Sequence, residues 1–332
     1  MAGELSVLEI CAGAGGQSLG LEQAGFAHEA AIEIEPVFCD TLRLNRPTWR
    51  IIAADVRDVS GQAFKGIDLL AGGVPCPPFS IAGKQLGSGD DRDLFPEALR
   101  LVEETRPGAV LLENVRGLSG SRFSSYRERV VSRLYRLGYE PHWQVLNASE
   151  FGVPQLRPRF VLVALRQKEA RHWRWPEAQG TPPVVGEVIG GLMGSAGWPG
   201  AIRWATNANG IAPTIVGGST KHGGPDLGPT RARAEWLRMG IDGLGIADEV
   251  PGPKEPVDLV PKLTLRMVAR LQGFPDDWQF AGRKTAAYRQ IGNAFPPPVA
   301  AAVGRSIYSA LSGGVRAKEA GAVARQMQLV SA

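Results

Sequence analysis

Short apolar runs alternate with amphipathic stretches from residue 5 to about residue 166. Each run has the length of a strand, and the stretches between them carry apolar residues at helical spacing. The expected strands are Ser6–Ile10, Glu29–Ile34, Ile67–Ala71, Ala109–Glu113, Trp143–Asn147 and Phe160–Leu165. The expected helices are Ser18–Ala24, Pro36–Leu44, Leu94–Glu104 and Ser124–Leu137. This alternation predicts an α/β fold built on a doubly wound parallel sheet.

A different pattern begins after about residue 168. Residues 175–262 are rich in Gly and Pro and show weak periodicity, with turn signals such as Trp198-Pro199-Gly200. Periodicity returns at Leu263–Leu271 and again near Val299–Leu311. The pattern predicts a smaller, loop-rich second domain over residues 171–262.

Composition narrows the function classes. At 332 residues the chain can bury the cores of two domains. Its net charge of +4 and its pI near 9.1 are compatible with nucleic-acid binding. The three cysteines form no C-x-x-C pair and the four histidines form no H-E-x-x-H, so we expect neither a metal site nor a disulfide scaffold. No apolar run approaches the roughly 20 residues of a membrane helix. A strand expected from Ser6 leaves no room for a signal peptide.

A cysteine follows one predicted strand in an unusual setting. Ile67–Ala71 leads into Gly72-Gly73-Val74-Pro75-Cys76-Pro77-Pro78-Phe79-Ser80. Prolines on both sides restrict the local backbone, so Cys76 would be held at the mouth of the sheet. A displayed thiolate is a nucleophile, and the segment is therefore a candidate for covalent catalysis. Most cysteines in proline-rich loops have no such role, so the interpretation depends on partners elsewhere.

Two further polar segments lie at strand ends. Glu113-Asn114-Val115 follows an apolar run, and Gln155-Leu156-Arg157-Pro158-Arg159 precedes another. Open α/β sheets bind ligands at the carboxyl ends of their strands. Alone, each segment would fit a strand-end cap or a solvated basic turn. Their order and spacing with the Cys76 segment make chance a poor explanation.

A glycine-rich turn, Gly13-Ala14-Gly15-Gly16, follows the first strand. Such a turn lets a ligand approach bare backbone at a helix N-terminus. The turn alone does not separate nicotinamide cofactors from S-adenosylmethionine, and position 18 is Ser, so G-x-G-x-x-G spacing is absent. Glu33 and Asp55 end two later runs, where their carboxylates could accept hydrogen bonds from ribose hydroxyls and an adenine amino group.

In this order, the segments resemble the cytosine-5 DNA methyltransferase family of bacterial restriction-modification systems. The resemblance covers Ser6 to about Arg166 and resumes from about Leu263 to Arg305. It includes two further segments, Arg266-x-x-x-Arg270-Leu271-Gln272-Gly273-Phe274-Pro275 and Gln290-Ile291-Gly292-Asn293-Ala294-Phe295-Pro296-Pro297-Pro298. Where the family has Asp-x-Phe the chain has Glu9-Ile10-Cys11, and Ile34 stands where an aromatic is common. We therefore expect somewhat weaker cofactor binding.

The resemblance implies a Rossmann-like, S-adenosyl-L-methionine-dependent enzyme that methylates carbon 5 of a flipped-out cytosine in duplex DNA. It groups residues 263–332 with 1–170 as the catalytic and cofactor-binding domain and leaves 171–262 for target recognition. It makes Cys76 the nucleophile at carbon 6, Glu113 the proton donor to ring nitrogen 3, and Asn114 a residue that fixes this geometry. Arg157 and Arg159 would bind the exocyclic oxygen and a nearby phosphate. The cofactor residues would be Cys11, Ala12, Gly13, Gly15, Gly16, Glu33, Ile34, Asp55, Val56, Leu94, Asn293 and Ala294.

For DNA we expect contacts from basic and polar side chains, since Arg and Lys can bind guanine edges or phosphates. The candidates are Ser80, Gln155, Arg203, Lys221, Arg231 and Arg233. The expected protein is a monomeric, cytoplasmic and nucleoid-associated bacterial enzyme, with a cognate restriction endonuclease as a possible genetic partner.

Three other functions compete with this one. A tRNA cytosine-5 methyltransferase would share the architecture, but the Cys-Phe-Thr signature of that branch is absent because no cysteine follows Cys76. An inactive DNA-binding relative would not need the complete set of catalytic residues. A nicotinamide-dependent oxidoreductase would explain the α/β alternation and leave the Cys76, Gln155–Arg159 and Gln290–Pro298 segments unexplained.

Overall fold

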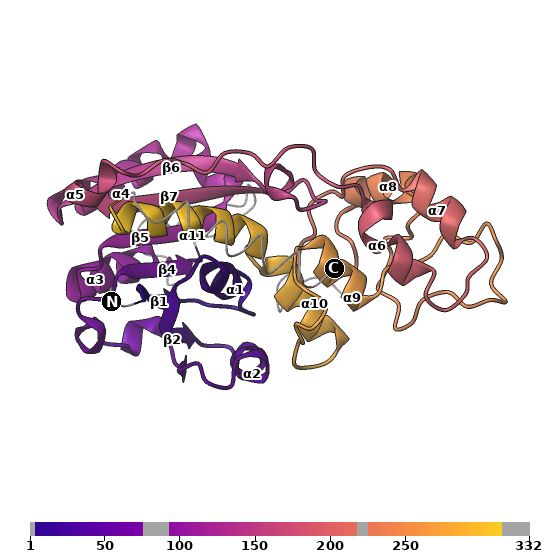
Figure 1. Ribbon diagram of the computed structural model, residues 1–332, viewed down its shortest axis with the longest axis horizontal. Coiled ribbons are helices and arrows are strands. Elements are labelled where there is room, and N and C mark those ends of the chain that lie inside the picture. The colour runs from indigo at the N-terminus through magenta and orange to yellow at the C-terminus, as the bar shows by residue number, and fades with distance from the viewer. Residues whose placement is uncertain (1–3, 76–92, 218–224, 314–332) are drawn as a thin grey trace.

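Seven strands form one sheet at the centre of the larger part of the molecule (Figure 1). The computed structural model describes residues 4–75, 93–217 and 225–313. The sheet order is β3-β2-β1-β4-β5-β7-β6. The strands are β1 (Ser6–Ile10), β2 (Ala27–Glu33), β3 (Ile51–Ala53), β4 (Leu69–Gly73), β5 (Ala109–Val115), β6 (Tyr139–Asn147) and β7 (Pro158–Arg166). The order in which strands are added to the sheet reverses at β1, which has β2 on one side and β4 on the other. The carboxyl ends of these three parallel strands lie at the same edge of the sheet.

One strand departs from the wholly parallel sheet expected from the sequence. β7 runs antiparallel to both β5 and β6, while β1 to β5 pair in parallel. A parallel neighbour would need a crossover of about a dozen residues or more, usually through a helix. Only a short connection with one 3-10 turn joins Asn147 to Pro158. The chain therefore turns back directly, and the expectation was wrong at this strand.

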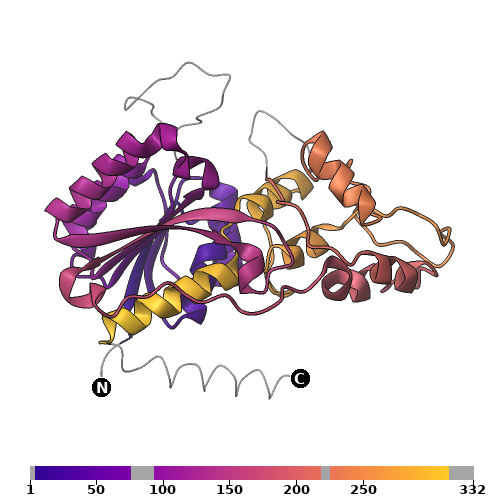
Figure 2. The same ribbon diagram turned by 90° about the horizontal axis from the view of Figure 1, so that it is seen from above.

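Helices cover both faces of the sheet, as Figure 2 shows from above. Val7 packs into a core with residues of α1 and α11, whereas its neighbour Leu8 packs on the other face with α3 and α4. This alternation confirms the doubly wound α/β architecture. The helices on the sheet are α1 (Gly16–Gln23), α2 (Pro36–Asn45), α3 (Phe95–Thr105), α4 (Ser124–Arg136), α5 (Gln167–Ala170) and α11 (Pro297–Leu311). Short 3-10 turns are η1 (Val56–Asp58), η2 (Gly61–Phe64), η3 (Arg116–Ser119), η4 (Ser121–Phe123) and η5 (Ala148–Phe151).

The smaller region contains more helix than its Gly- and Pro-rich sequence predicts. Its helices are α6 (Val185–Met193), α7 (Ala201–Asn207), α8 (Thr230–Arg238), α9 (Leu265–Leu271) and α10 (Lys284–Asn293). They share a core in which Trp204 and Trp236 pack with Met267 of α9 and Tyr288 of α10. Only from Phe295 onward does the chain rejoin the core of the sheet. Residues 263–294 pack mainly in the core of the smaller region but also contact the glycine turn before α1 and α2, as in the bonds of Trp278 to Ala14 and of Thr41 to Gln290. The expected domain boundary at residue 263 stays a prediction.

Where the chain returns to the sheet, α11 packs closely against α1. A Cβ placed on Gly20 would lie 2.5 Å from the Cβ of Ala300 and 2.5 Å from the carbonyl oxygen of Pro297. Gly16 is equally tight, because its Cβ would lie 2.4 Å from the carbonyl oxygen of Phe295. These contacts hold the start of α11 beside the glycine turn. Within the described ranges, no helix combines the length and the apolar character needed to cross a membrane.

Candidate active site

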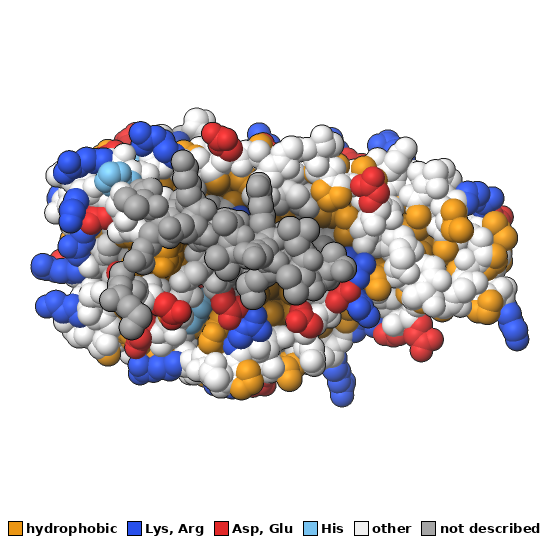
Figure 3. Space-filling model, viewed as in Figure 1, with side chains coloured by type: hydrophobic (Ala, Val, Ile, Leu, Met, Phe, Trp, Pro, Cys, Tyr) orange, Lys and Arg blue, Asp and Glu red, His pale blue; other side chains and the backbone are white. Residues whose placement is uncertain are grey.

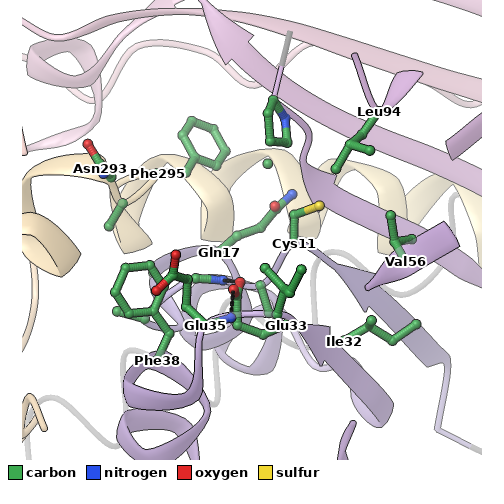
Figure 4. A pocket seen from close by; sticks show the side chains of 18 of the residues that line it. Cys11, Gln17, Ile32, Glu33, Glu35, Phe38, Val56, Leu94, Asn293 and Phe295 are labelled. Atoms are coloured by element: carbon green, nitrogen blue, oxygen red, sulfur yellow. Dashed lines mark hydrogen bonds between the residues drawn. The ribbon is translucent and has the colours of Figure 1, made fainter. Parts of the chain in front are cut away.

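A cavity of about 450 Å³ lies at the carboxyl ends of the strands (Figure 4). Its walls include Cys11 after β1, Glu33 at the end of β2 and Gly73 at the end of β4. This is the edge where open α/β sheets bind ligands, and the volume is typical of small-molecule sites, roughly 300–1,000 Å³. All the cofactor residues expected from the sequence line this cavity, except Gly15.

Gly15 has a packing role instead. Its φ of 85° is in the left-handed region, and a Cβ there would lie 2.7 Å from the Trp278 ring. The close approach is therefore made by a tryptophan of the smaller region and not by a ligand. Gly13, by contrast, lines the cavity with open space where a side chain would stand, and its N–H donates to Glu33 Oε2 at 2.7 Å.

Two carboxylates stand on one side of the cavity. Glu33 is buried, and its oxygens accept hydrogen bonds from the N–H groups of Gly13 (2.7 Å) and Glu35 (2.9 Å). Burial raises the pKa of Glu33, and these backbone donors oppose the rise. Asp55 pairs with Arg57 at 2.9 Å. Since an ionised carboxylate offers about four acceptor positions, both acids retain capacity for a ligand.

The two cysteines that the structure describes are poor nucleophiles. Burial, with the nearby charges of Glu33 and Asp55, raises the pKa of the Cys11 thiol to about 12. Cys39 is fully buried in α2 and its thiol donates to the Glu33 carbonyl at 3.3 Å. Burial also raises the pKa of Cys39. Because the thiolate is the reactive form, neither cysteine is suited to attack a substrate. Cys76, Ser80 and Lys221 lie outside the described residues.

A buried ion pair stands where β5 meets β7. Arg159 Nε lies 2.7 Å from Glu113 Oε1, and the two side chains are only 12% and 11% exposed. Burial raises the pKa of Glu113, opposed mainly by the charge of Arg159 and then by that of Arg157. Glu113 also lines the cavity, and a side chain at Gly73 would come within 3.5 Å of its Oε2. The absence of that side chain leaves this carboxyl group open to the cavity.

Asn114 is bonded to the segment that leaves β4. Its amide donates to the carbonyl of Val74 at 2.7 Å, and its Oδ1 accepts from the N–H of Val115 at 2.8 Å. The end of β5 is thereby tied to the chain leaving β4, two residues before Cys76. This position is the one expected for a residue that fixes the geometry of the site.

Arg157 does not have the surroundings of a substrate contact. Its side chain is fully buried, and the guanidinium donates to the carbonyls of Ile215 (2.5 Å), Gly292 (2.7 Å) and Ala294 (2.9 Å). Burial holds the pKa of Arg157 well below its usual range. With both terminal nitrogens occupied by backbone, the expected contact with cytosine or phosphate is not available. We therefore reassign Arg157 as the centre of a junction between segments, called the Arg157 junction below.

Gln155 is corrected for the same reason. It is fully buried, donates to the Leu271 carbonyl at 3.1 Å and to Gln272 Oε1 at 2.7 Å, and accepts from the N–H of Ile215 at 2.9 Å. These bonds use both ends of its amide, so no group remains for a DNA base. Gln155 supports the Arg157 junction instead.

The family is settled by comparison with known proteins. A family model described as C-5 cytosine-specific DNA methylase matches residues 5–214 and 231–309. The chain belongs to this family. It is a DNA (cytosine-5-)-methyltransferase.

Two curated relatives of this methyltransferase are similar over nearly its whole length. The type II methyltransferase M.NaeI of Lentzea aerocolonigenes is 57% identical over 312 residues, covering 93% of this chain and 76% of the relative. M.NgoMIV of Neisseria gonorrhoeae is 53% identical, covering 93% and 98%. Among solved structures, a variant of Spodoptera frugiperda DNMT2 has a TM-score of 0.65 at 19% identity, covering 92% of this chain and 99% of that one. Entamoeba histolytica EhMeth has a TM-score of 0.65 at 14% identity, covering 93% and 99%. These structures share the fold of the methyltransferase.

The basic residues expected to bind DNA do not gather on one face of the methyltransferase. Figure 2 shows α8, which carries Arg231 and Arg233, on the side of α3 and α4, whereas α6 and α7 lie on the side of α11. Arg203 is on α7 and donates to the Val257 carbonyl at 2.8 Å. On the face in Figure 3, cationic side chains over the smaller region are scattered among hydrophobic ones. The α8 face is the side on which Leu94, at the start of α3, borders the cavity.

Several cavity residues were not expected from the sequence. Phe38 and Phe295 supply aromatic rings to the cavity even though Ile34 and Cys11 replace the family's aromatics. Phe38 lies in α2 just after Glu33, so its nearness to the end of β2 was the available signal. Gln17 follows the glycine turn directly and was also missed. The others are Ala14, Ile32, Glu35, Ala54, Arg57, Gly73, Pro75 and Gln290.

Proposed function

We propose that the methyltransferase uses S-adenosyl-L-methionine to methylate carbon 5 of a flipped-out cytosine in a specific duplex DNA sequence, as the modification enzyme of a type II restriction-modification system. The observation that carries the proposal is the buried Glu113–Arg159 pair beside the strand-end cavity, in a chain of the C-5 cytosine-specific family. The names of M.NaeI and M.NgoMIV as type II methyltransferases support the restriction-modification setting.

The cavity fits the cofactor in its chemistry as well as its volume. Val56 and Leu94 offer apolar contacts for an adenine ring, and Asp55 offers an acceptor for its amino group. Glu33 offers acceptors for ribose hydroxyls at the end of β2, while open space beside Gly13 lets a ligand approach the backbone. When bound, S-adenosyl-L-methionine would supply an electrophilic methyl group.

Cytosine needs help from the protein because its carbon 5 is a weak nucleophile. Addition of the Cys76 thiolate to carbon 6 would push electrons towards carbon 5, while Glu113 donates a proton to ring nitrogen 3. The enamine-like carbon 5 would then be reactive towards the methyl group that S-adenosyl-L-methionine supplies, with S-adenosylhomocysteine as the leaving group. Loss of the carbon-5 proton to a base, for which water is a candidate, would let the ring expel the Cys76 thiolate. Return of the proton on ring nitrogen 3 to Glu113 would then restore a neutral aromatic ring. The base must leave the DNA stack to reach these groups.

Arg159 has two tasks in this proposal. Its ion pair with Glu113 orients the carboxyl group, and as a buried cation it can offset charge that develops on the exocyclic oxygen of the base. Asn114 holds the chain leading to Cys76, and Arg157 holds the surrounding backbone. We further propose that the enzyme acts as a monomer on the DNA of a bacterial cytoplasm.

Bisulfite sequencing of DNA from a methylation-free host that expresses the chain tests this function. We expect protected cytosines at one recurring short sequence, and none from the Cys76→Ala variant. Calorimetry should show that the variant still binds S-adenosylhomocysteine, which separates lost chemistry from lost folding. Turnover by Cys76→Ala would defeat the covalent route. Unmethylated DNA from a folded, cofactor-binding wild type would favour an RNA substrate, and tRNA would be sequenced next.

A further inference from the structure

Gln17 is a buried polar residue that the proposed chemistry leaves unused. It is the second residue of α1, and its side chain is 3% exposed. Neither its amide nitrogen nor its amide oxygen has a hydrogen-bond partner among the residues that the structure describes. Buried side-chain amides are normally paired, because an unmade hydrogen bond costs about 1–3 kcal/mol. An apolar side chain of similar size would fill this position without that cost, so the amide calls for a ligand.

The amide is placed to meet such a ligand. Gln17 lines the strand-end cavity, and Figure 4 shows its amide group extending towards Cys11, away from the Glu33 carboxylate. The residue directly follows the glycine turn. In Figure 4, Val56 and Leu94, which suit an adenine ring, lie on the other side of Cys11 from Gln17.

The charges of the cavity restrict what the ligand group can be. Four carboxylates line it, namely Glu33, Glu35, Asp55 and Glu113. Among the described lining residues Arg57 is the cationic one, and it pairs with Asp55. The cavity therefore offers no unpaired cation, among its described lining residues, to a negatively charged ligand group. Such a group would be bound by neutral donors, which lie near the glycine turn. A primary amide offers both a donor and an acceptor, and so matches a zwitterion carrying a carboxylate and an ammonium.

We propose that the Gln17 amide binds the amino-acid end of the cofactor. Nε2 donates to the carboxylate and Oε1 accepts from the ammonium, beside the backbone N–H groups at the start of α1. The assignment rests on the proposed use of S-adenosyl-L-methionine and adds a recognition residue to its pocket.

Two ligands that differ at this end provide the test. S-adenosylhomocysteine contains the amino-acid group, whereas 5′-methylthioadenosine keeps the adenine, ribose and sulfur without it. Isothermal titration calorimetry of Gln17→Leu should show a 10- to 100-fold loss of affinity for S-adenosylhomocysteine, the range for hydrogen bonds to charged groups. Affinity for 5′-methylthioadenosine should stay within about twofold of wild type, since no contact to that ligand is removed.

Matched variants make the result decisive. Gln23→Leu changes an exposed glutamine at the other end of α1 and should leave both affinities unchanged. Gln17→Glu keeps the shape but replaces the donor with a negative charge, so it should also lose S-adenosylhomocysteine selectively. Equal loss of both ligands in the two Gln17 variants, or no loss of S-adenosylhomocysteine, would overturn the proposal. A wild-type protein that binds neither ligand would instead count against the proposed function.

Discussion

At the scale of single residues, the environment of Glu113 determines its chemistry. Burial raises the pKa of this carboxyl group, so it keeps its proton to a higher pH than an exposed glutamate. In the proposed mechanism the protonated form donates to ring nitrogen 3, and this form is lost as the pH rises through the raised pKa. We therefore expect the methylation rate to fall on the alkaline side. Glu113→Gln should lower kcat by about 10²–10⁴-fold and abolish that alkaline limb.

Rapid-quench measurement of single turnovers across pH, with saturating DNA, tests this expectation. Glu140→Gln is the matched control, because it neutralises a carboxylate on β6 that does not line the cavity. A nearly normal rate for Glu113→Gln, or an unchanged alkaline limb, would show that another group protonates the ring.

Sequence patterns located Glu33, Glu113 and Asn114 because each follows an apolar run that forms a strand in the sheet. They misplaced Arg157 and Gln155, since a Q-x-R-x-R segment looks the same whether it faces solvent or core. The partners of Arg157 are 58 to 137 residues away in the chain. Only the three-dimensional fold brings those carbonyls around the guanidinium.

At the scale of elements, the contact between α1 and α11 depends on a missing side chain. A Cβ at Gly20 would collide with Ala300 and with the backbone at Pro297 and Ala301. Backbone atoms have little room to move, so Gly20→Ala should lower the free energy of unfolding by about 2–3 kcal/mol. Gly191→Ala in α6 meets no atom within 4 Å and should be neutral or stabilising by up to about 1 kcal/mol. Urea denaturation of both variants checks the difference, and equal stabilities would contradict the packing argument.

The end of α9 is joined to the following loop by a small charge network. Arg266 and Arg270 both pair with Asp276, and these bonds lower the pKa of Asp276 to about 2 from an ordinary value of 3.8. The depressed pKa means that the stabilisation is present above about pH 4 and is lost as the pH falls towards 2. Because the pairs are partly exposed, Asp276→Asn should cost about 1 kcal/mol at pH 7. Urea denaturation at pH 7 and pH 3 should show the cost shrinking in acid, and a constant cost would contradict the charge argument.

Periodicity predicted most elements of the sheet domain to within a few residues. It could not predict that β7 is reversed, because strand direction depends on the connection and not on the apolar run. It also missed α6, α7 and α8. Their helical stretches are short and interrupted by Gly and Pro, and they are stabilised by a tryptophan-rich core whose members are far apart in sequence.

At the scale of the whole molecule, the two sides of the smaller region should differ in their importance for DNA. Arg231 on α8 has a side chain that is 93% exposed, on the side where Leu94 borders the cavity. Arg203 belongs to α7, which lies on the side of α11 (Figure 2). Arg231→Ala should weaken duplex binding several-fold and reduce the slope of log K against log salt by about 1 if one phosphate contact is lost. Arg203→Ala should change neither the affinity nor the slope. Fluorescence anisotropy at several salt concentrations measures both quantities. A larger loss for Arg203→Ala than for Arg231→Ala would show that the assignment of faces is wrong.

The Arg157 junction has a consequence for how new specificities arise. Among the described residues, the guanidinium is bonded to main-chain carbonyls, namely those of Ile215, of Gly292 in α10 and of Ala294 just after α10. Such a bond does not depend on which side chain the carbonyl's residue carries. We expect the smaller region to read the DNA sequence. Its side chains can then be replaced extensively, by mutation or by recombination between genes, while the Arg157 junction with the sheet domain stays intact. In a chimaera of two such enzymes, the transplanted region should therefore keep its position relative to the active site if the backbone conformation at Ile215 is preserved. This should hold whatever DNA sequence the transplanted region recognises.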